Sequence, residues 1–443
     1  MLNFLRISCI DSQKGCIFFS GKKLLDQYLG ARGHDAKQVH GAAFSNFILA
    51  LTISMMFGLP AQAEISDTIH PFVAVSYSYD DNLLRLPDNG AGLNSPQSDT
   101  TKAVQAGLLL ERPIGQQLLT GHANINKVTF DRFTTLDYTG KDFLGALNWH
   151  VAKHVDGNLG VSYVETLTPF TDFHLDQLNL LRERREYVDA AWLFHPSFRM
   201  HGGFTRDNFN YNLSSQVLNN RTEDASVFGI DFLASSASTV GVQLRHLKAT
   251  YPNPFFSGAG FFDNSYEQNE AKANISWIVS GTSQVEFLGG WTRRKHASVS
   301  TNNNDNGTTF RLTGHWAPLG RVGFTAAAWR DFAAVASISA GNSSTSSLNK
   351  GASIAANWAA SAKLSANAQF TREQRDFSAT DNIVVPQDAT DLTRSASAGL
   401  SYAALRNVQL NANVSHSSRS GDVFLGLSTY RSNAISFNAT GQF

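Results

Sequence analysis

The end of the chain, residues 433–443, is the feature that most restricts the fold. Its side chains alternate between apolar or small residues and polar ones, and the last residue is Phe443. Ile435 and Phe437 fall on one side of the segment, and Ser436 falls on the other. Because successive side chains of a strand point to opposite faces, the segment predicts a strand with one apolar face. Such a final strand, ending on an aromatic residue, is typical of bacterial outer-membrane barrels, and Phe443 is expected to guide the barrel-insertion machinery.

The same alternation recurs along most of the chain, and no helical period is long enough to compete with it. An even number of strands places both ends of the chain on the same side of the membrane. Counts of sixteen or twenty strands are also compatible with the pattern. The eighteen predicted strands are 69–80, 100–112, 115–131, 138–152, 154–166, 179–195, 197–211, 221–234, 238–251, 264–279, 282–297, 307–318, 320–336, 347–361, 363–378, 391–404, 406–418 and 430–443.

Short and long connections alternate between these strands. Short turns are predicted at 112–115, 195–197, 280–282, 317–320 and 404–406. Longer polar connections are predicted at 81–99, 167–178, 212–220, 252–263, 298–306, 337–346, 379–390 and 419–429. Outer-membrane barrels sort periplasmic turns from extracellular loops in this way, whereas a soluble sandwich has no reason to do so. We therefore predict an all-β fold: a closed, transmembrane, antiparallel β-barrel of about 18 strands.

The beginning of the chain predicts export. An apolar run at 44–59 is followed by Ala-Gln-Ala at 61–63, which is the pattern of a signal peptide with its cleavage site. The domains expected are a cleaved, extended presequence, 1–63, and an outer-membrane barrel, 64–443. The first forty residues are either an extended export signal or lie upstream of the true start. No plug domain is expected, because strands begin directly after the predicted cleavage site.

Composition excludes several classes of protein. Hydrophobic residues make up 42% and charged residues 16% of the chain, against roughly a quarter charged in ordinary soluble domains. The chain is therefore neither disordered nor a helical membrane protein. Lys and Arg total 36, as do Asp and Glu, so no basic field argues for nucleic acid as a partner. Cys9 and Cys16 both precede the cleavage site, so the barrel needs no disulfide.

Charged residues within the strands are expected to face the lumen. A Lys or Arg at the bilayer midplane costs roughly 2–4 kcal/mol. A one-residue shift in the register of a strand would turn all of its polar side chains toward lipid. Such a wall can bind successive hydroxyls of a sugar chain, although pairing among the side chains themselves is the favoured alternative for any single residue. The lumen candidates are Arg199, Arg245, Glu270, Lys272, Lys363, Gln369, Glu373 and Arg375, with His201, Asp207, Gln243, Glu286 and Arg311 as further members.

Aromatic residues fall in two places. Six tryptophans lie on the apolar side of the strands, close to strand ends, where a ring with a polar group favours the headgroup zone. They are Trp149, Trp192, Trp277, Trp291, Trp316 and Trp358. The connection 251–262 carries five more aromatic residues. It either folds inward as a constriction or packs on neighbouring loops.

No motif indicates catalysis. The chain has no metal-ligand spacing, no nucleophile elbow and no phosphate-binding loop. Asp80 and Asp81 are adjacent, so in a strand they point to opposite faces and do not converge. The segment 303–307 is better explained as an Asn/Gly turn than as a calcium loop. We therefore expect no enzyme activity, no catalytic residues, no cofactor and no metal.

The first strand and its exit, 72–88, resemble a known family. The specific part is the sequence Tyr-Asp-Asp-Asn-Leu-Leu-Arg-Leu-Pro-Asp at 79–88, and Arg-Asp-Phe-Ser at 375–378 is a weaker match. These segments look like those of the exopolysaccharide-biosynthesis-operon outer-membrane proteins, EpsL type, which are grouped with β-barrel porins. The resemblance implies exopolysaccharide as a partner, beside periplasmic and inner-membrane machinery for polysaccharide synthesis and export. It brings no catalytic residues with it.

The main functional hypothesis is therefore an outer-membrane barrel, surrounded by outer-membrane lipid, that takes part in exopolysaccharide biosynthesis or export as a hydrophilic channel. A general porin for small solutes is the first alternative. An outer-membrane enzyme and an adhesive structural barrel are the other two. The fold alone does not decide among them.

Overall fold

The computed structural model describes residues 68–87, 97–171, 173–257, 260–297, 305–334, 346–378, 389–421 and 429–443. The predicted presequence and its cleavage site lie outside these residues. So do the central parts of four predicted loops, 298–306, 337–346, 379–390 and 419–429, and part of the loop 81–99.

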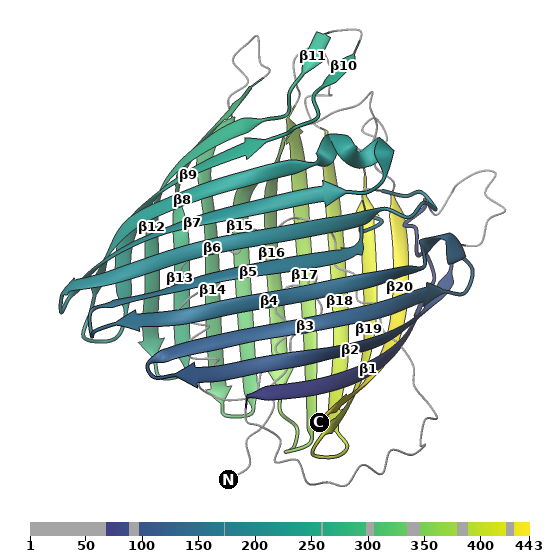
Figure 1. Ribbon diagram of the computed structural model, residues 1–443, viewed down its shortest axis with the longest axis horizontal. Helices are drawn as coiled ribbons and strands as arrows, with labels where there is room; N and C mark the ends of the chain where they lie inside the picture. The colour runs from purple at the N-terminus through teal and green to yellow at the C-terminus, as the bar shows by residue number, and fades with distance from the viewer. Residues whose placement is uncertain are drawn as a thin grey trace.

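The wall of the molecule is a single antiparallel sheet of eighteen strands (Figure 1). Every strand pairs with its neighbour in sequence, β9 pairs with β12, and β1 pairs with β20, so the sheet closes on itself. The strands are β1 (Ile69–Asp80), β2 (Asp99–Ile114), β3 (Gln117–Phe130), β4 (Tyr138–Val151), β5 (Val155–Leu167), β6 (Leu180–His195), β7 (Phe198–Tyr211), β8 (Arg221–Leu233), β9 (Thr239–Thr250), β12 (Tyr266–Ser280), β13 (Ser283–His296), β14 (Asp305–Leu319), β15 (Val322–Ala334), β16 (Ser346–Trp358), β17 (Leu364–Ser378), β18 (Thr390–Ala403), β19 (Val408–Ser420) and β20 (Tyr430–Gln442).

The closed barrel and the predicted count of eighteen strands are confirmed. Each predicted strand overlaps one observed strand, with ends that differ by a few residues. Short turns gather at the lower end in Figure 1 and longer connections at the upper end, which we call the periplasmic and extracellular ends. Within the described residues no separate domain fills the barrel. No helix there is long and apolar enough to cross a membrane.

Three short elements were not predicted. Helical turns η2 (Thr134–Leu136) and η3 (Ser214–Asn219) lie in extracellular connections. The third is a hairpin of β10 (Phe255–Ser257) and β11 (Gly260–Phe262). Strand β14 also runs one residue past its predicted end, through a register shift between Trp316 and Leu319. Pro318 lies in that shift, where a residue without an N–H interrupts the ladder least.

The two faces of the sheet differ in chemistry. The outer face exposes large apolar side chains, among them Val104, Leu244, Ile354 and Leu400. Five of the six predicted girdle tryptophans are more than half exposed there, as Trp277 is at 59%. The inner face instead holds nearly all the buried polar and charged residues. A sheet leaves no backbone group unpaired in hydrocarbon only when it is closed, so this construction is that of a membrane-spanning barrel.

The seam between the first and last strands closes the barrel. Phe72 to Asp80 of β1 pair with Gln442 to Ala434 of β20. Beyond the last pair, the backbone N–H of Phe443 donates to the carbonyl of Pro71 at 2.8 Å, and the Phe443 side chain is 56% exposed. The terminal aromatic residue therefore lies at the periplasmic end of the seam. Its role in insertion stays a prediction.

Candidate channel lumen

The strand register turns seven of the eight predicted lumen residues to the inner face. Arg245 lies directly opposite Glu270, and Glu373 opposite Gly351. Their role in lining a conducting path stays a prediction, since most of them have partners within the wall. The seven are Arg199, Arg245, Glu270, Lys272, Gln369, Glu373 and Arg375.

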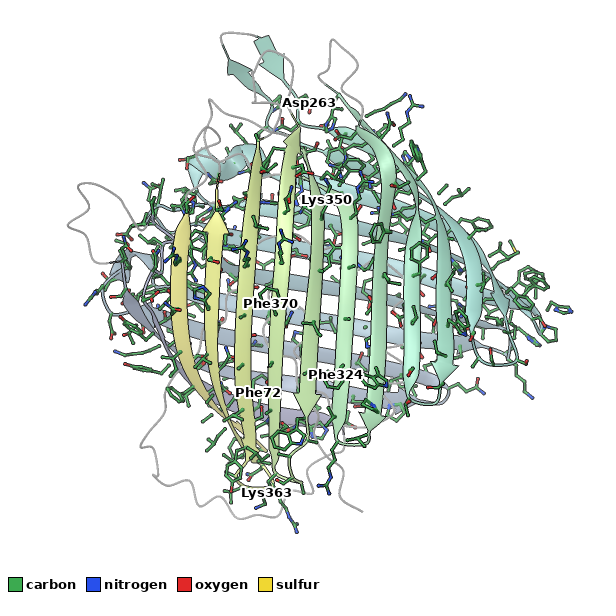
Figure 2. The ribbon with its side chains drawn as sticks, turned by 180° about the vertical axis from the view of Figure 1, so that it is seen from behind. Phe72, Asp263, Phe324, Lys350, Lys363 and Phe370 are labelled. Carbon is green, nitrogen blue, oxygen red and sulfur yellow. The ribbon has the colours of Figure 1, made fainter. Side chains whose placement is uncertain are left out.

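The eighth residue, Lys363, lies outside the wall. It is exposed in the turn before β17, which begins at Leu364 instead of at 363 (Figure 2). The hydroxyl of Ser361 accepts the backbone N–H groups of Lys363 and Leu364 at 3.1 and 3.0 Å. This serine turn ends the hairpin, and it holds Lys363 at the periplasmic rim.

A buried charge cluster joins β9 and β12. Glu270 accepts a hydrogen bond from Arg245 Nη1 at 2.5 Å and lies 2.7 Å from Lys272 Nζ. Each of the three side chains is less than a tenth exposed. Gln268 also donates to Glu270. Burial of charge is tolerated where each charge has a close partner, so these residues bond one another within the wall instead of presenting open binding groups.

A second cluster crosses β17, β18 and β19. The carboxylate of Asp391 is fully buried and accepts from Arg375 Nη2 and Arg419 Nη2, each at 2.5 Å. One carboxylate thus lies between two guanidinium groups from the strands on either side. Arg419 also donates to the backbone carbonyl of Thr171, which belongs to the connection between β5 and β6.

The connection 168–179 therefore runs inside the extracellular mouth. Thr171 meets Arg419 on β19, although the connection starts and ends on β5 and β6. The ring nitrogen Nδ1 of His174 lies 3.0 Å from the carbonyl of Leu84. Phe170 of the connection belongs to an apolar cluster with Val128 and Phe130 on the inner face of β3 and with Leu83, Leu84 and Leu136 of neighbouring connections. We call residues 168–171 and 173–179 the entrance loop, because the connection reaches from β5 and β6 to Arg419 on β19 at this end of the barrel.

The segment that carries the family resemblance forms a clasp over the seam. Asp80 accepts from Arg85 Nη1 and Nη2 at 2.9 and 2.8 Å and from the hydroxyl of Ser432 at 2.8 Å. The side-chain amide of Asn82 donates to the carbonyls of Leu86 and Arg431 at 2.8 and 2.9 Å. Residues 80–86 thereby tie β1 to β20. Closure of the barrel therefore explains the residue pattern of this segment.

The other candidates for chemistry are paired as well. Asp81 points away from Asp80, as their adjacency predicts, and accepts two hydrogen bonds from Asn433 at 2.7 Å. His201 Nδ1 and Arg199 Nη2 lie 3.0 and 2.7 Å from the fully buried carboxylate of Asp231. This arrangement offers no pair of convergent carboxylates. The further candidate Asp207 likewise accepts from Arg185 Nε at 2.7 Å.

The periplasmic half of the inner face differs on β17 to β20. Ser365, Asn367 and Gln369 are exposed although they face inward, so water reaches this part of the interior. The neighbouring residues are also neutral: Asn411 Nδ2 donates to Asn438 Oδ1 at 3.1 Å. Neutral amides and hydroxyls remain hydrated without a fixed ionic partner, so this surface suits the passage of polar solutes.

The described parts of the aromatic connection, 251–257 and 260–262, do not enter the barrel. Its hairpin, β10 and β11, extends beyond the extracellular rim in both views (Figures 1 and 2). At its base Tyr251 is buried in an apolar cluster with Leu247 and Tyr266, and burial raises the pKa of Tyr251 to about 12. Asn253 Nδ2 donates to the carbonyl of Val217 at 2.8 Å, so the base packs on the neighbouring connection.

Several residues that organise the interior were not among the candidates. They are Asp231, Asp391, Arg419, Arg294 and the inward Trp329, whose Nε1 donates to Glu373 at 2.9 Å. Asp391 could have been found by pairing the predicted strands 363–378 and 391–404 as a hairpin, which places a carboxylate beside Arg375. No comparable pattern in the sequence predicts the path of the entrance loop.

Comparison with known proteins assigns this chain to no family. No protein-family model matches the chain. No curated protein matches it. Solved structures with a similar arrangement include OccAB3 of Acinetobacter baumannii, at 9% identity and TM-score 0.46, covering 86% of this chain and 100% of that one. OccK2 (OpdF) of Pseudomonas aeruginosa has 10% identity and TM-score 0.47 over 85% and 98%. A BenF-like porin from Pseudomonas fluorescens has 10% identity and a TM-score of 0.44, covering 85% of this chain and 98% of that one.

These likenesses are too distant to carry a substrate or a family to this chain. The location instead follows from the barrel itself. An even number of antiparallel strands, an apolar outer band, tryptophans near the strand ends and a polar interior are together the construction of an outer-membrane barrel. The protein is a β-barrel of the bacterial outer membrane.

Proposed function

We propose that the protein is a passive channel for small hydrophilic solutes. The observation that carries this proposal is the exposed, neutral inner surface of Ser365, Asn367 and Gln369 in an eighteen-stranded barrel. Barrels of sixteen to eighteen strands leave an aqueous channel when no domain fills them. A wall of amides and hydroxyls lets polar solutes exchange hydrogen bonds without a deep binding trap, which conduction requires.

The entrance loop supports small solutes over a polymer. It lies inside the mouth and is held there by Arg419 and by packing of Phe170 on the inner face. A chain folded across the mouth reduces the free cross-section that a sugar polymer would need. The proposal is therefore the small-solute porin, the first alternative from sequence, ahead of the exopolysaccharide channel.

Export of exopolysaccharide is the second candidate. The resemblance at 79–88 favours it, and hydroxyl-binding amides along the lumen are compatible with it. Yet Asp80, Asn82 and Arg85 all act in the clasp over the seam, so the pattern would be kept for closure whatever the channel transports. This candidate makes a distinct prediction: polysaccharide from the producing strain should enter the lumen and block current.

Conductance of single channels in planar bilayers tests the proposal. The purified barrel should give stable openings that the strain's own polysaccharide leaves unchanged. In Arg419→Ala the pair Arg375–Asp391 remains, but the entrance loop loses its anchor, so conductance should increase. Arg206→Ala removes an arginine on the outer face that pairs with Asp224, and it should leave conductance unchanged.

The outcomes separate the candidates. Absence of any ion current from a correctly folded barrel would show that the protein is not a channel. Block by polysaccharide at the concentrations present at the cell surface would favour the export role. Unchanged conductance in Arg419→Ala would show that the entrance loop does not limit the path.

A further inference from the structure

The periplasmic part of the inner face carries four carboxylates without basic partners. Each lies within six residues of the strand end that meets a short turn, and the strand register turns each one inward. Asp189 accepts from the backbone N–H and the side-chain amide of Asn158 at 3.1 and 3.0 Å, and Glu286 accepts from Gln284 Nε2 at 3.2 Å. Within the described residues none of the four forms an ion pair with Lys or Arg. The four, here called the lumen carboxylates, are Glu111, Asp156, Asp189 and Glu286.

Inward basic residues of the same zone do not offset these charges. Within six residues of the periplasmic ends of the described strands, the inward Lys and Arg side chains are Arg199 and Arg245. Arg199 pairs with Asp231 at 2.7 Å, and Arg245 pairs with Glu270 at 2.5 Å. Each basic group therefore has a carboxylate of its own, and the lumen carboxylates remain in excess.

Water reaches the lumen carboxylates. Asp156 is exposed, and the other three are half-buried. A hydrated carboxylate carries a negative charge at neutral pH. In the extracellular part of the interior, by contrast, ion pairs such as Arg185–Asp207 and Arg221–Glu223 neutralise charge within the wall. The excess negative charge is therefore a property of the periplasmic part of the lumen.

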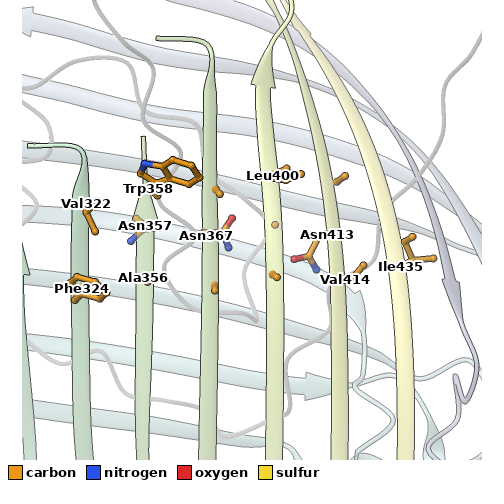
Figure 3. A pocket seen from close by; sticks show the side chains of 15 residues that line it. Val322, Phe324, Ala356, Asn357, Trp358, Asn367, Leu400, Asn413, Val414 and Ile435 are labelled. Atoms are coloured by element: carbon orange, nitrogen blue, oxygen red, sulfur yellow. The ribbon is translucent and has the colours of Figure 1, made fainter. Parts of the chain in front are cut away.

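The wall across the lumen offers neutral groups instead. In the eighteen-stranded ring nine steps separate β5 from β16, and β6 from β17, in either direction, so these strands lie on opposite walls (Figure 1). Asn357 pairs with Asn367 in the register, and Gly399 lies between Asn367 and Asn413. Figure 3 shows the three asparagines at similar height on β16, β17 and β19. A solute in the lumen therefore has carboxylates on one side and amides on the other.

Basic residues at the periplasmic rim lie outside this zone. They occur in the short turns or beside them, and all are exposed. In bulk water of high dielectric constant their field is weak, whereas the low-dielectric wall of a channel focuses the field of charges inside it. The lumen carboxylates therefore dominate the field that a permeating ion meets. The rim residues are Arg112, Lys153, Arg321, Lys363 and Arg406.

We propose that the channel prefers cations and that the lumen carboxylates set this preference, an inference that rests on the proposed channel function. The carboxylates attract a cation into the lumen, and the amides opposite them exchange hydrogen bonds with its water shell. The four charges are spread over β2, β5, β6 and β13, so no single site traps the ion, as conduction requires. The favoured solutes are small molecules that carry an ammonium group.

Reversal potentials of the purified barrel in planar bilayers test the preference. In a salt gradient near 0.1 M the parent should give a ratio of K⁺ to Cl⁻ permeability of about three or more. The ratio should approach about one in 1 M salt, where the screening length falls to about 3 Å. The variant E111Q/D156N/D189N/E286Q should have a ratio of about one at low salt as well, because it lacks the excess charge. In vesicle swelling the parent should admit ethanolamine faster than glycolate, an anion of similar size.

Two controls locate the effect. E186Q/D224N removes two carboxylates from the outer face, where Glu186 pairs with Arg184 and Asp224 pairs with Arg206, and it should leave the permeability ratio unchanged. R112Q/K153Q removes two cations from the rim and should raise the ratio by less than about twofold, because those charges are screened by bulk solvent. Heat-dependent gel mobility verifies that each variant is folded, and the salt dependence of the parent needs no variant.

The outcomes separate this inference from the channel function. A parent that conducts but favours Cl⁻ or neither ion would overturn the cation preference and leave the channel function intact. The parent's ratio in a folded E111Q/D156N/D189N/E286Q variant would overturn the assignment to the lumen carboxylates. Absence of any current from the folded parent would overturn the channel function and the preference together.

Discussion

Strands β17 to β19 carry two different inner surfaces along their length. Toward their extracellular ends Arg375, Asp391 and Arg419 form a buried charge cluster that holds the entrance loop. Toward the periplasmic end of β17, Ser365 and Asn367 are neutral and exposed. The same strands with the same backbone pairing support both surfaces. The difference therefore lies in how the side chains are used: charge occurs where groups pack together, and neutral polar groups occur where water enters.

The physical reason is the cost of desolvation. A charged group that leaves water must find a close partner, whereas a hydrated amide needs none. Buried ion pairs in the extracellular half therefore act as structural joints. Removal of one charge from the Arg375–Asp391–Arg419 cluster should therefore destabilise the barrel strongly, and changes at the exposed neutral residues of β17 should alter transport without altering stability.

Asp391→Ala should have the largest effect. It leaves Arg375 and Arg419 buried without their shared carboxylate, and breaking a buried pair by removing one partner costs about 3–5 kcal/mol. Urea unfolding in lipid vesicles, followed by tryptophan fluorescence, measures the change in free energy of unfolding. The control is Asn367→Ala on the exposed surface, for which a change below about 0.5 kcal/mol is expected. Similar losses in both variants would remove the distinction between the two surfaces.

The seam clasp should give an intermediate effect. Asn82→Ala removes the hydrogen bonds from the side-chain amide to Leu86 and Arg431, and leaves two carbonyls without these donors. A loss of about 1–3 kcal/mol is expected for a buried group of this kind. The temperature at which the folded band converts to the unfolded band on a gel reports it. Asp81→Ala, which breaks the exposed bonds to Asn433, should lower this temperature less. A larger effect of Asp81→Ala would contradict the assignment of Asn82 to closure.

The alternation of apolar and polar residues predicted the barrel, because a strand between lipid and a polar interior needs an apolar side chain at every outward position. In 408–415 each outward position is apolar or small and each inward position is polar, so the alternation predicts both the strand and the face on which each side chain lies. The clasp, the charge partners and the entrance loop were not predicted, for a different reason. Asp391 meets Arg375 only through the register between two strands, and Thr171 meets Arg419 only through the path of a loop with no period.

Lys363 illustrates the limit at strand ends. Its position has the inward parity of Gln369, so alternation alone places both in the lumen. The hydroxyl of Ser361 instead caps the turn and ends the ladder one residue later, at Leu364. Period predicts which way a strand residue points. It does not predict where the strand begins or ends, because local hydrogen bonds such as the two that Ser361 accepts decide that.

Gln369→Lys should have the smallest effect on stability and a measurable one on transport. The side chain is exposed to the interior, so a new cation can stay hydrated, and the free energy of unfolding should change by less than about 0.5 kcal/mol. At 0.1 M salt a charge acts over about 10 Å, which covers only part of a wide lumen. The ratio of anion to cation permeability should therefore rise by a small factor, about two, measured as a shift in reversal potential across a salt gradient.

The control for Gln369→Lys is Asn269→Lys, which adds the same charge on the outer face of β12. The side-chain oxygen of Asn269 lies 2.8 Å from the ring nitrogen Nδ1 of His246 on that face, away from the lumen. It should leave the reversal potential unchanged. If both variants shift the potential equally, the added charge acts through the surface of the barrel and not through its interior. If Gln369→Lys destabilises the barrel as strongly as Asp391→Ala, the periplasmic half is packed like the extracellular half, and the open neutral surface does not exist.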